Sequence, residues 1–335
     1  MKTLEKSCIY KSSIINPDAL DAMNYYGKKC TPFLFVIDFL ALKPFIAPLS
    51  NLSKSVLYDF NGFTNYTENI TSRKKIEFEK FPVAYAVYKQ SFDCVHHHLF
   101  VGNSYLVNLT FPTVINTNYS LYETFCNSKA PYKLLFDDQF VVFSPEAFVI
   151  MKDSYIYTFP MKGTIDATIP DAKEILLNDE KEFAEHITVV DLLRNDLSKV
   201  SHSVCVENFR YYSTIKTHNK TILQTSSTIK GTLYPYYHKH LGWLFAALLP
   251  AGSVTGAPKK RTVEIIQEAE TYNRGYYTGV CGYFDGKDVI SAVMIRFIEN
   301  SSNGLIFKSG GGITIYSNPE VEYNEMIEKV YVPIN

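Results

Sequence analysis

Residues 133–160 contain a succession of short apolar runs rich in Phe, Tyr, Val and Ile, interrupted by polar residues every few positions. Runs of this length and composition indicate strands, because β-branched and aromatic side chains fit a pleated surface. Aromatic residues make up 15% of the chain, which also favours a sheet-rich interior. Further strand signals lie at 32–44, 81–92, 104–111, 279–284, 289–299 and 304–316.

Three segments have helical signals instead, each with a recognisable start. They are 178–200 (N-cap Asp179, with Glu182 three residues later), 257–271 (Pro258 in the first turn) and 317–330 (N-cap Ser317, with Pro319 and Glu320 in the first turn). Long strand runs with few helices between them predict an α+β fold, not alternating βαβ units. Length alone suggests two domains, but no clear boundary divides the chain, so we predict a single domain over 1–335.

Charge and composition exclude several classes of partner. The net charge is −1, which argues against a nucleic-acid binder. The apolar stretch 32–49 is broken by Asp38 and Lys43, and 241–252 is too short to span a bilayer, so we expect no membrane segment. The six cysteines form no C-x-x-C pair and no signal peptide is evident, which predicts reduced thiols and a cytoplasmic protein.

Two pairs of glutamates are candidates for a metal site. Glu182 and Glu185 are three residues apart on the first predicted helix, and Glu322 and Glu325 repeat this spacing on the last. One such pair is usually a solvated helix face. Two pairs facing each other would need a cation between them, and carboxylate oxygens suit Mg²⁺. The spacing does not tell whether the two helices face each other.

Three further features leave alternatives open. Gly310, Gly311 and Gly312 follow a predicted strand and could supply backbone N–H donors to an anion, or form a bulge. The loop 250–257 opens a helix, but its glycine spacing is not that of a P-loop. The histidines 96–98 follow Cys94; expected in a strand, they would point to opposite faces, which favours structural or surface roles over a metal site.

Taken together, several stretches resemble the chorismate-utilising enzymes, which include the component I chains of anthranilate synthase and aminodeoxychorismate synthase, and the isochorismate and salicylate synthases. The match covers about 91–335, and 1–90 is a variable N-terminal part that matches loosely. Six matching stretches in the family's order make the resemblance specific. They are SPE (144–146), AEHITVVDLLRNDLSKV (184–200), PAGSVTGAPKKRTVEIIQEAE (250–270), RGYYTGVCGYF (274–284), MIRF (294–297) and GGGITIYSNPEVEYNEMIEKV (310–330).

The resemblance implies a fold of two extended antiparallel β-sheets packed on each other, with helices outside. It also implies a Mg²⁺ ion held by Glu185 and Glu325, with Glu182 and Glu322 beside them. Glu146 matches the general acid that protonates the departing C4 hydroxyl of chorismate, a role that requires a raised pKa. The implied contacts to the substrate carboxylates come from Arg296, Tyr277, Thr164, Lys329 and the glycines 310–312.

Lys162 separates the reactions within this family. Anthranilate synthases usually have alanine at the matching position, whereas aminodeoxychorismate synthases have a lysine that attacks C2 of the ring as the C4 hydroxyl leaves. Ammonia then adds at C4 and expels the lysine. The resemblance therefore implies Mg²⁺-dependent amination of chorismate to 4-amino-4-deoxychorismate, in 4-aminobenzoate and folate synthesis. Since the chain has no glutaminase signature, ammonia would come from a glutamine amidotransferase subunit or from solution.

Some positions depart from the family pattern. Ile165 stands where arginine is frequent, and Gln224 where many relatives have histidine. Leu106 replaces the lysine that activates water in isochorismate and salicylate synthases, so water-adding reactions are not expected. Two alternative readings remain: anthranilate synthase component I in tryptophan biosynthesis, and a non-catalytic chorismate-binding subunit.

Overall fold

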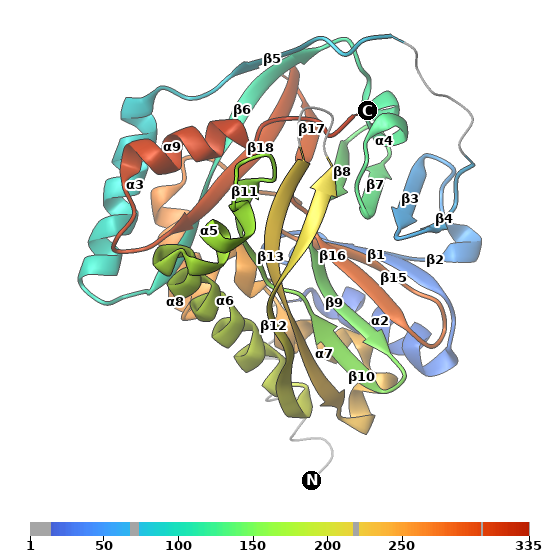
Figure 1. The fold of residues 1–335 in the computed structure, drawn as a ribbon. Helices are drawn as coiled ribbons and strands as arrows, with labels where there is room; N and C mark the ends of the chain where they lie inside the picture. Colours follow the sequence, from blue (N-terminus) through green and yellow to red (C-terminus); the bar gives the residue numbers. More distant parts are fainter. Residues whose placement is uncertain (1–14, 68–73, 217–220, 303, 335) are drawn as a thin grey trace.

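The computed structural model describes residues 15–67, 74–216, 221–302 and 304–334. Two nine-stranded antiparallel sheets form the centre of the molecule, and helices lie on their outer sides (Figure 1). We name them sheet A and sheet B. In spatial order, sheet A contains β11 (Met161–Asp166), β13 (Thr221–Leu233), β10 (Tyr155–Thr158), β9 (Ala147–Lys152), β16 (Val289–Val293), β15 (Val280–Phe284), β1 (Phe33–Ile37) and β2 (Phe45–Pro48), with β12 (Ser201–Lys216) paired to β13.

Sheet B is assembled from strands of both halves of the chain. In spatial order it contains β14 (Gly256–Ala257), β6 (Leu106–Thr117), β18 (Gly304–Ile313), β17 (Phe297–Ser301), β8 (Phe140–Ser144), β7 (Tyr132–Phe136), β3 (Val56–Phe60) and β4 (Phe63–Thr64), with β5 (Phe78–Phe81) paired to β6. This arrangement confirms the predicted α+β fold with two antiparallel sheets.

Alternation of side chains along the strands explains the layering. In β1, Phe33, Phe35 and Ile37 join one hydrophobic cluster, whereas Leu34 and Val36 join another. The first cluster packs sheet A against helices, and the second fills the space between the two sheets. A strand buried on both faces reads as a continuous apolar run, because each face has a core to fill.

Helices cover the outer face of each sheet. The cluster outside sheet A includes residues of α2 (Pro17–Lys29), α6 (Glu180–Ser198) and α7 (Leu241–Leu248). Outside sheet B, α3 (Tyr85–Phe100), α8 (Lys259–Ala269) and α9 (Pro319–Glu328) pack together over β6 and β18, and α4 (Leu121–Asn127) packs over β7 and β8. The remaining short helices are α5 (Ala172–Asn178), η1 (Leu49–Asn51), η2 (Pro235–His238) and η3 (Gly252–Val254).

Some sequence predictions are wrong near the N-terminus. The segment 81–92, predicted as a strand, contains only the end of β5 and then enters helix α3. Its buried residues Tyr88, Phe92, Val95 and Leu99 recur at helical spacing, so one stripe faces the core. Helix α2 was not predicted, although Asn16 caps it and Pro17 occupies its first turn.

The three predicted helices are present, with one different cap. Asp179 caps α6 by accepting a hydrogen bond from the Glu182 backbone N–H, as predicted. Helix α9 is capped by Asn318 and not by Ser317, because the Asn318 side chain accepts from the backbone N–H groups of the first turn. In the described part of the chain, no helix combines the length and the apolar character needed to cross a membrane.

Candidate active site

The first two turns of two helices that are far apart in sequence carry the four candidate glutamates. Glu182 and Glu185 lie on α6, and Glu322 and Glu325 lie on α9. Glu322 is 7% exposed, and one of its oxygens accepts a hydrogen bond from the Ser317 hydroxyl at 2.9 Å. Ser317, which does not cap the helix, therefore orients a carboxylate.

Lys162 on β11 lies beside α6. Its Nζ atom is 2.6 Å from a carboxylate oxygen of Glu185, and the two side chains are 30% and 16% exposed. Burial works to lower the pKa of Lys162, but attraction to Glu185, Glu182 and Glu325 outweighs it and raises the pKa. Glu325 of α9 acts on the same ammonium, so its carboxylate lies within electrostatic range of the pair formed by Lys162 and Glu185.

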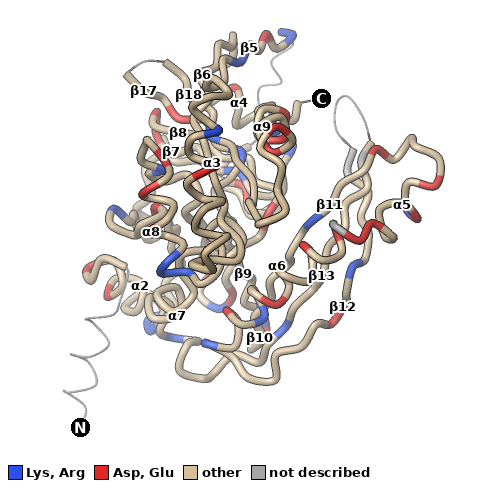
Figure 2. Tube along the Cα trace, turned by 90° about the vertical axis from the view of Figure 1, so that its left-hand side faces the viewer, with Lys and Arg blue, Asp and Glu red and all other residues tan. Residues whose placement is uncertain are grey.

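The local backbone fits this placement of charge. Gly163, next to Lys162, has a φ of +78°, and a Cβ atom there would lie 3.0 Å from a Glu182 oxygen. Glycine therefore permits both the turn of the chain and the close approach of the carboxylate. Figure 2 shows β11 against α6, with acidic positions on α6 and a basic position on β11.

Glu146 and Arg296 lie where the chain passes from one sheet to the other. Glu146 is between β8 of sheet B and β9 of sheet A, and Arg296 is between β16 of sheet A and β17 of sheet B. Because β8 pairs with β17 and β9 with β16, the two crossings are adjacent. Backbone hydrogen bonds join them: the Val293 N–H donates to the Glu146 carbonyl, and the Phe143 N–H donates to the Arg296 carbonyl.

The surroundings of Glu146 favour its protonated form. Burial raises the pKa of this carboxyl, and neither the Ser253 hydroxyl, which donates to it, nor the nearby Arg296 cancels the effect. A carboxyl whose pKa is raised is better suited to act as a general acid.

Arg296 has features expected of a side chain that binds an anionic ligand. Its backbone has a φ of +54°, which is strained for a non-glycine residue. Its guanidinium lies over the Tyr331 ring at 5.3 Å, just beyond α9. Its Nε is buried, and no described residue accepts a hydrogen bond from it. An anionic ligand would satisfy this donor.

A buried ion pair that the sequence did not suggest lies close to Tyr277 along the chain. Tyr277 is 4% exposed, and burial raises its pKa, so the phenol stays neutral. Three residues before it, Arg274 forms two hydrogen bonds with Glu270, at 2.6 and 2.8 Å. Arg274 also donates to the Val254 carbonyl and the Thr278 hydroxyl, which flank Ser253 and Tyr277. Arg274 therefore links two of the segments that form the site.

Comparison with known proteins identifies the family. A sequence model described as chorismate binding enzyme matches residues 47–335. The chain belongs to the chorismate binding enzymes.

Relatives of this family differ in the reaction that their names state. A protein of Haemophilus influenzae, named as an uncharacterized PabA-like protein, is 52% identical over 94% of this chain and 96% of its own length. Anthranilate synthase component 1 of Archaeoglobus fulgidus is 31% identical, covering 92% of this chain and 76% of its own. Aminodeoxychorismate synthase component 1 of Bacillus subtilis is 32% identical, covering 73% and 54%.

The fold agrees with solved structures of the family. A menaquinone-specific isochorismate synthase from Escherichia coli superposes with a TM-score of 0.69 over 91% of this chain and 78% of its own, at 17% identity. At that identity the likeness establishes the fold and not the reaction.

Within this chorismate binding fold, Lys329 and the three glycines complete one wall of the site. The Lys329 ammonium lies 2.7 Å from Glu325 and donates to the Gly310 carbonyl at 3.0 Å. The sequence predicted that the glycines 310–312 follow a strand. They lie instead inside β18, paired with β6. The pairing of β18 with β17 ends at Lys308. Among the described strands, none pairs with the other edge at the glycines, so backbone groups there can meet a ligand.

Gly310 and Gly311 differ in what a side chain at each position would contact. A Cβ atom on Gly311 would lie 3.5 Å from a Glu322 oxygen and 3.6 Å from the Lys329 ammonium, so the missing side chain faces the charged groups. A Cβ atom on Gly310 would instead lie 2.2 Å from the Leu109 carbonyl oxygen, which no packing tolerates. Gly310 is therefore needed for the pairing of β18 with β6, and Gly311 leaves room beside the charged groups of the site.

Two other positions of β11 and β13 complete the description. Thr164 is exposed on β11 and pairs with Gln224 of β13, so the predicted substrate contact and the departure from the family pattern are neighbours.

Sequence reasoning missed His186, which follows Glu185 and is fully buried. Its Nε2 shares a hydrogen bond with the Ser227 hydroxyl at 2.7 Å. Burial, with Arg210 and Lys162, lowers its pKa to about 4, so it is neutral at pH 7.

Proposed function

We propose that the chain aminates chorismate to 4-amino-4-deoxychorismate through a covalent adduct with Lys162, using Mg²⁺ and ammonia. Two observations carry this proposal: the Lys162 amine interacts with carboxylates of α6 and α9, and the carboxyl of Glu146, at the crossing between the sheets, has a raised pKa. A lysine inside the site, with an acid able to protonate a leaving hydroxyl, is the pair that amination by this route requires.

The donor set fits a magnesium ion. Glu182, Glu185, Glu322 and Glu325 supply only oxygen ligands from two helices, and the site already stabilises a cation at Lys162. When bound, Mg²⁺ would anchor the ring carboxylate of chorismate and neutralise the glutamates that raise the pKa of Lys162.

In the proposed amination, Lys162 acts as the nucleophile and Glu146 as the proton donor. The neutral Lys162 amine attacks C2, both ring double bonds shift along the ring, and the C4–O bond breaks as Glu146 gives its proton to the departing hydroxyl. Ammonia next forms the C4–N bond and the C2–Nζ bond breaks, which restores the amine. One proton of the ammonia returns to Glu146, so the sum is chorismate plus ammonia giving 4-amino-4-deoxychorismate plus water. Arg296, with its unsatisfied Nε, would hold the side-chain carboxylate.

Product identification tests this proposal. The purified chain, chorismate, Mg²⁺ and an ammonium salt are mixed, and the products are separated before and after addition of an aminodeoxychorismate lyase. We expect 4-aminobenzoate only after the lyase is added, and a large loss of turnover in Lys162→Ala. Anthranilate as the product would refute the proposal, and unchanged turnover in Lys162→Ala would remove the covalent step.

Anthranilate synthase component I is the second candidate. It is supported by the Archaeoglobus fulgidus relative, which matches more of this chain than the Bacillus subtilis aminodeoxychorismate synthase does. For either reaction we propose a glutamine amidotransferase subunit as the source of ammonia. Turnover with glutamine only after such a subunit is added would support this partner.

A further inference from the structure

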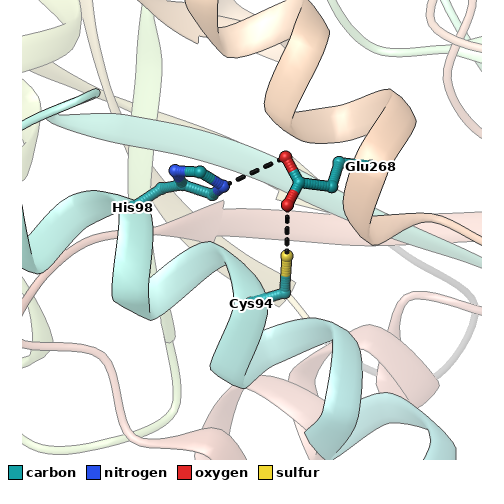
Figure 3. A group of neighbouring side chains, drawn as sticks. All are labelled: Cys94, His98 and Glu268. Atoms are coloured by element: carbon teal, nitrogen blue, oxygen red, sulfur yellow. Dashed lines mark hydrogen bonds and ion pairs between the residues drawn. The ribbon is translucent and has the colours of Figure 1, made fainter.

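A group of metal-ligating side chains lies away from the candidate active site. Cys94 and His98 are one helical turn apart on α3, and Glu268 faces them from α8 (Figure 3). One ligand atom of each residue lies within 4.8 Å of the other two. The chemistry proposed above uses none of these residues.

The helical structure of 85–100 creates this arrangement. Residues four apart on a helix lie on one face, so Cys94 and His98 point in the same direction. Phe92, Val95 and Leu99 pack with Ile266 and Ala269 of α8 in one cluster, which holds the two helices together. The three polar side chains therefore lie beside a packed interface that fixes their separation.

Distances within the group are close to those of a metal centre. One Glu268 oxygen is 3.9 Å from the Cys94 sulfur, and the other is 3.2 Å from His98 Nε2. Ligand atoms of a tetrahedral zinc site with sulfur, nitrogen and oxygen donors are separated by about 3.3–3.6 Å. These two contacts use different oxygens of Glu268, and one ligand atom of each residue lies within 4.8 Å of the others, so side-chain movements of about 1 Å would bring the three atoms around one ion.

A neighbouring side chain can orient the imidazole. The Asn103 side-chain amide lies 2.9 Å from His98 Nδ1. Rotated by half a turn, the amide would present its oxygen to an Nδ1–H, which leaves the Nε2 lone pair for a metal. Histidine ligands usually have such a partner on the second ring nitrogen.

We propose that Cys94, His98 and Glu268 bind one zinc-class divalent cation between α3 and α8. Mixed sulfur, nitrogen and oxygen donors select this class over Mg²⁺. On binding, the thiol releases its proton to solvent and the imidazole proton moves from Nε2 to Nδ1. A thiolate and a carboxylate then neutralise the two charges of the ion. The Glu268 side chain is 56% exposed, so the fourth coordination position faces water.

Cobalt titration tests the site, because a thiolate bound to Co²⁺ produces a near-ultraviolet charge-transfer band that oxygen ligands do not. The full chain, without any histidine tag, is titrated with Co²⁺ in excess Mg²⁺, which occupies oxygen-only sites. We expect one equivalent of Co²⁺, the sulfur band, and displacement of Co²⁺ by Zn²⁺. Absence of the band, or its persistence in Cys94→Ser, would overturn the proposal.

Variants with matched controls separate the site from general metal binding. We expect His98→Asn and Glu268→Gln each to weaken Co²⁺ binding at least tenfold, and Asn103→Ala by about 10- to 100-fold, because the imidazole then loses the partner that orients it. Cys205→Ser, at an exposed cysteine of β12, should bind like the wild type. Circular dichroism verifies the fold of each variant. Wild-type affinity in Glu268→Gln, an exposed position that the fold does not need, would contradict the three-ligand site.

Discussion

Replacing Lys162 by methionine should destabilise the protein when divalent cations are absent, and Mg²⁺ should reverse the loss. Methionine keeps most of the side-chain volume but removes the ammonium that lies 2.6 Å from Glu185. Breaking a fully buried pair costs about 3–5 kcal/mol, and an exposed pair contributes about 0–1 kcal/mol. The partners are 30% and 16% exposed, so we expect a decrease of about 1–3 kcal/mol in the free energy of unfolding.

Urea unfolding with EDTA or with Mg²⁺ measures this effect. In EDTA the variant leaves Glu182, Glu185 and Glu325 to repel one another without the ammonium. Mg²⁺ should therefore stabilise the variant more than the wild type, in which Lys162 competes for the same carboxylates. Lys230→Met is the control, since its ion pair with Glu207 is at the surface and should change stability by less than about 1 kcal/mol. Equal stability of Lys162→Met and wild type in EDTA would refute the reasoning, as would a larger Mg²⁺ effect on the wild type.

Three further tests use four other substitutions. Because burial raises the pKa of Glu146, the wild type loses stability as pH rises above the pKa of the unfolded carboxyl. Glu146→Gln should reduce turnover about 10²–10⁴-fold. Its stability relative to wild type, measured by urea unfolding, should nevertheless increase from pH 5 to pH 8. Gly311→Ala should raise KM with little change in thermal stability, whereas Gly310→Ala, whose Cβ would meet a backbone carbonyl, should destabilise the fold; the opposite pattern would contradict the assigned roles. Arg274→Met should cost about 3–5 kcal/mol in urea unfolding because it leaves the Glu270 carboxylate buried without its partner, and a loss below 1 kcal/mol would contradict the linking role.

The helices that carry the glutamates were predictable because their signals are local. The capping residue Asp179 and the apolar spacing after it lie within one window of sequence, and α6 begins at Glu180, within two residues of the prediction. That Lys162 pairs with Glu185 of α6 and also feels the charge of Glu325 of α9 was not accessible from spacing, since it depends on how both helices pack on different sheets. The family resemblance supplied that expectation.

Helix α3 shows how local signals mislead. The segment 81–92 is rich in tyrosine, phenylalanine and valine, which favour strands, and this propensity outweighed the helical spacing of the residues that face the core. The error had a chemical consequence. In a strand, neighbouring histidines point apart, whereas in the helix His98 lies one turn from Cys94 and beside Glu268.

The buried link through Arg274 was invisible for another reason. Its partners Glu270 and Val254 are near in sequence, but the Asn108 carbonyl that it also contacts lies on β6, more than 160 residues earlier. No periodicity or spacing connects such positions.

The two crossings between the sheets have a consequence for how this protein can change. Glu146 and Arg296 are located by strand pairs that run directly into both sheets, so their separation depends on main-chain register and not on the packing of surface loops. Loops and the N-terminal segment can therefore diverge widely while the acid and the guanidinium keep their spacing. A substitution that slid one sheet over the other would act in the opposite way, impairing turnover before the protein lost much of its stability.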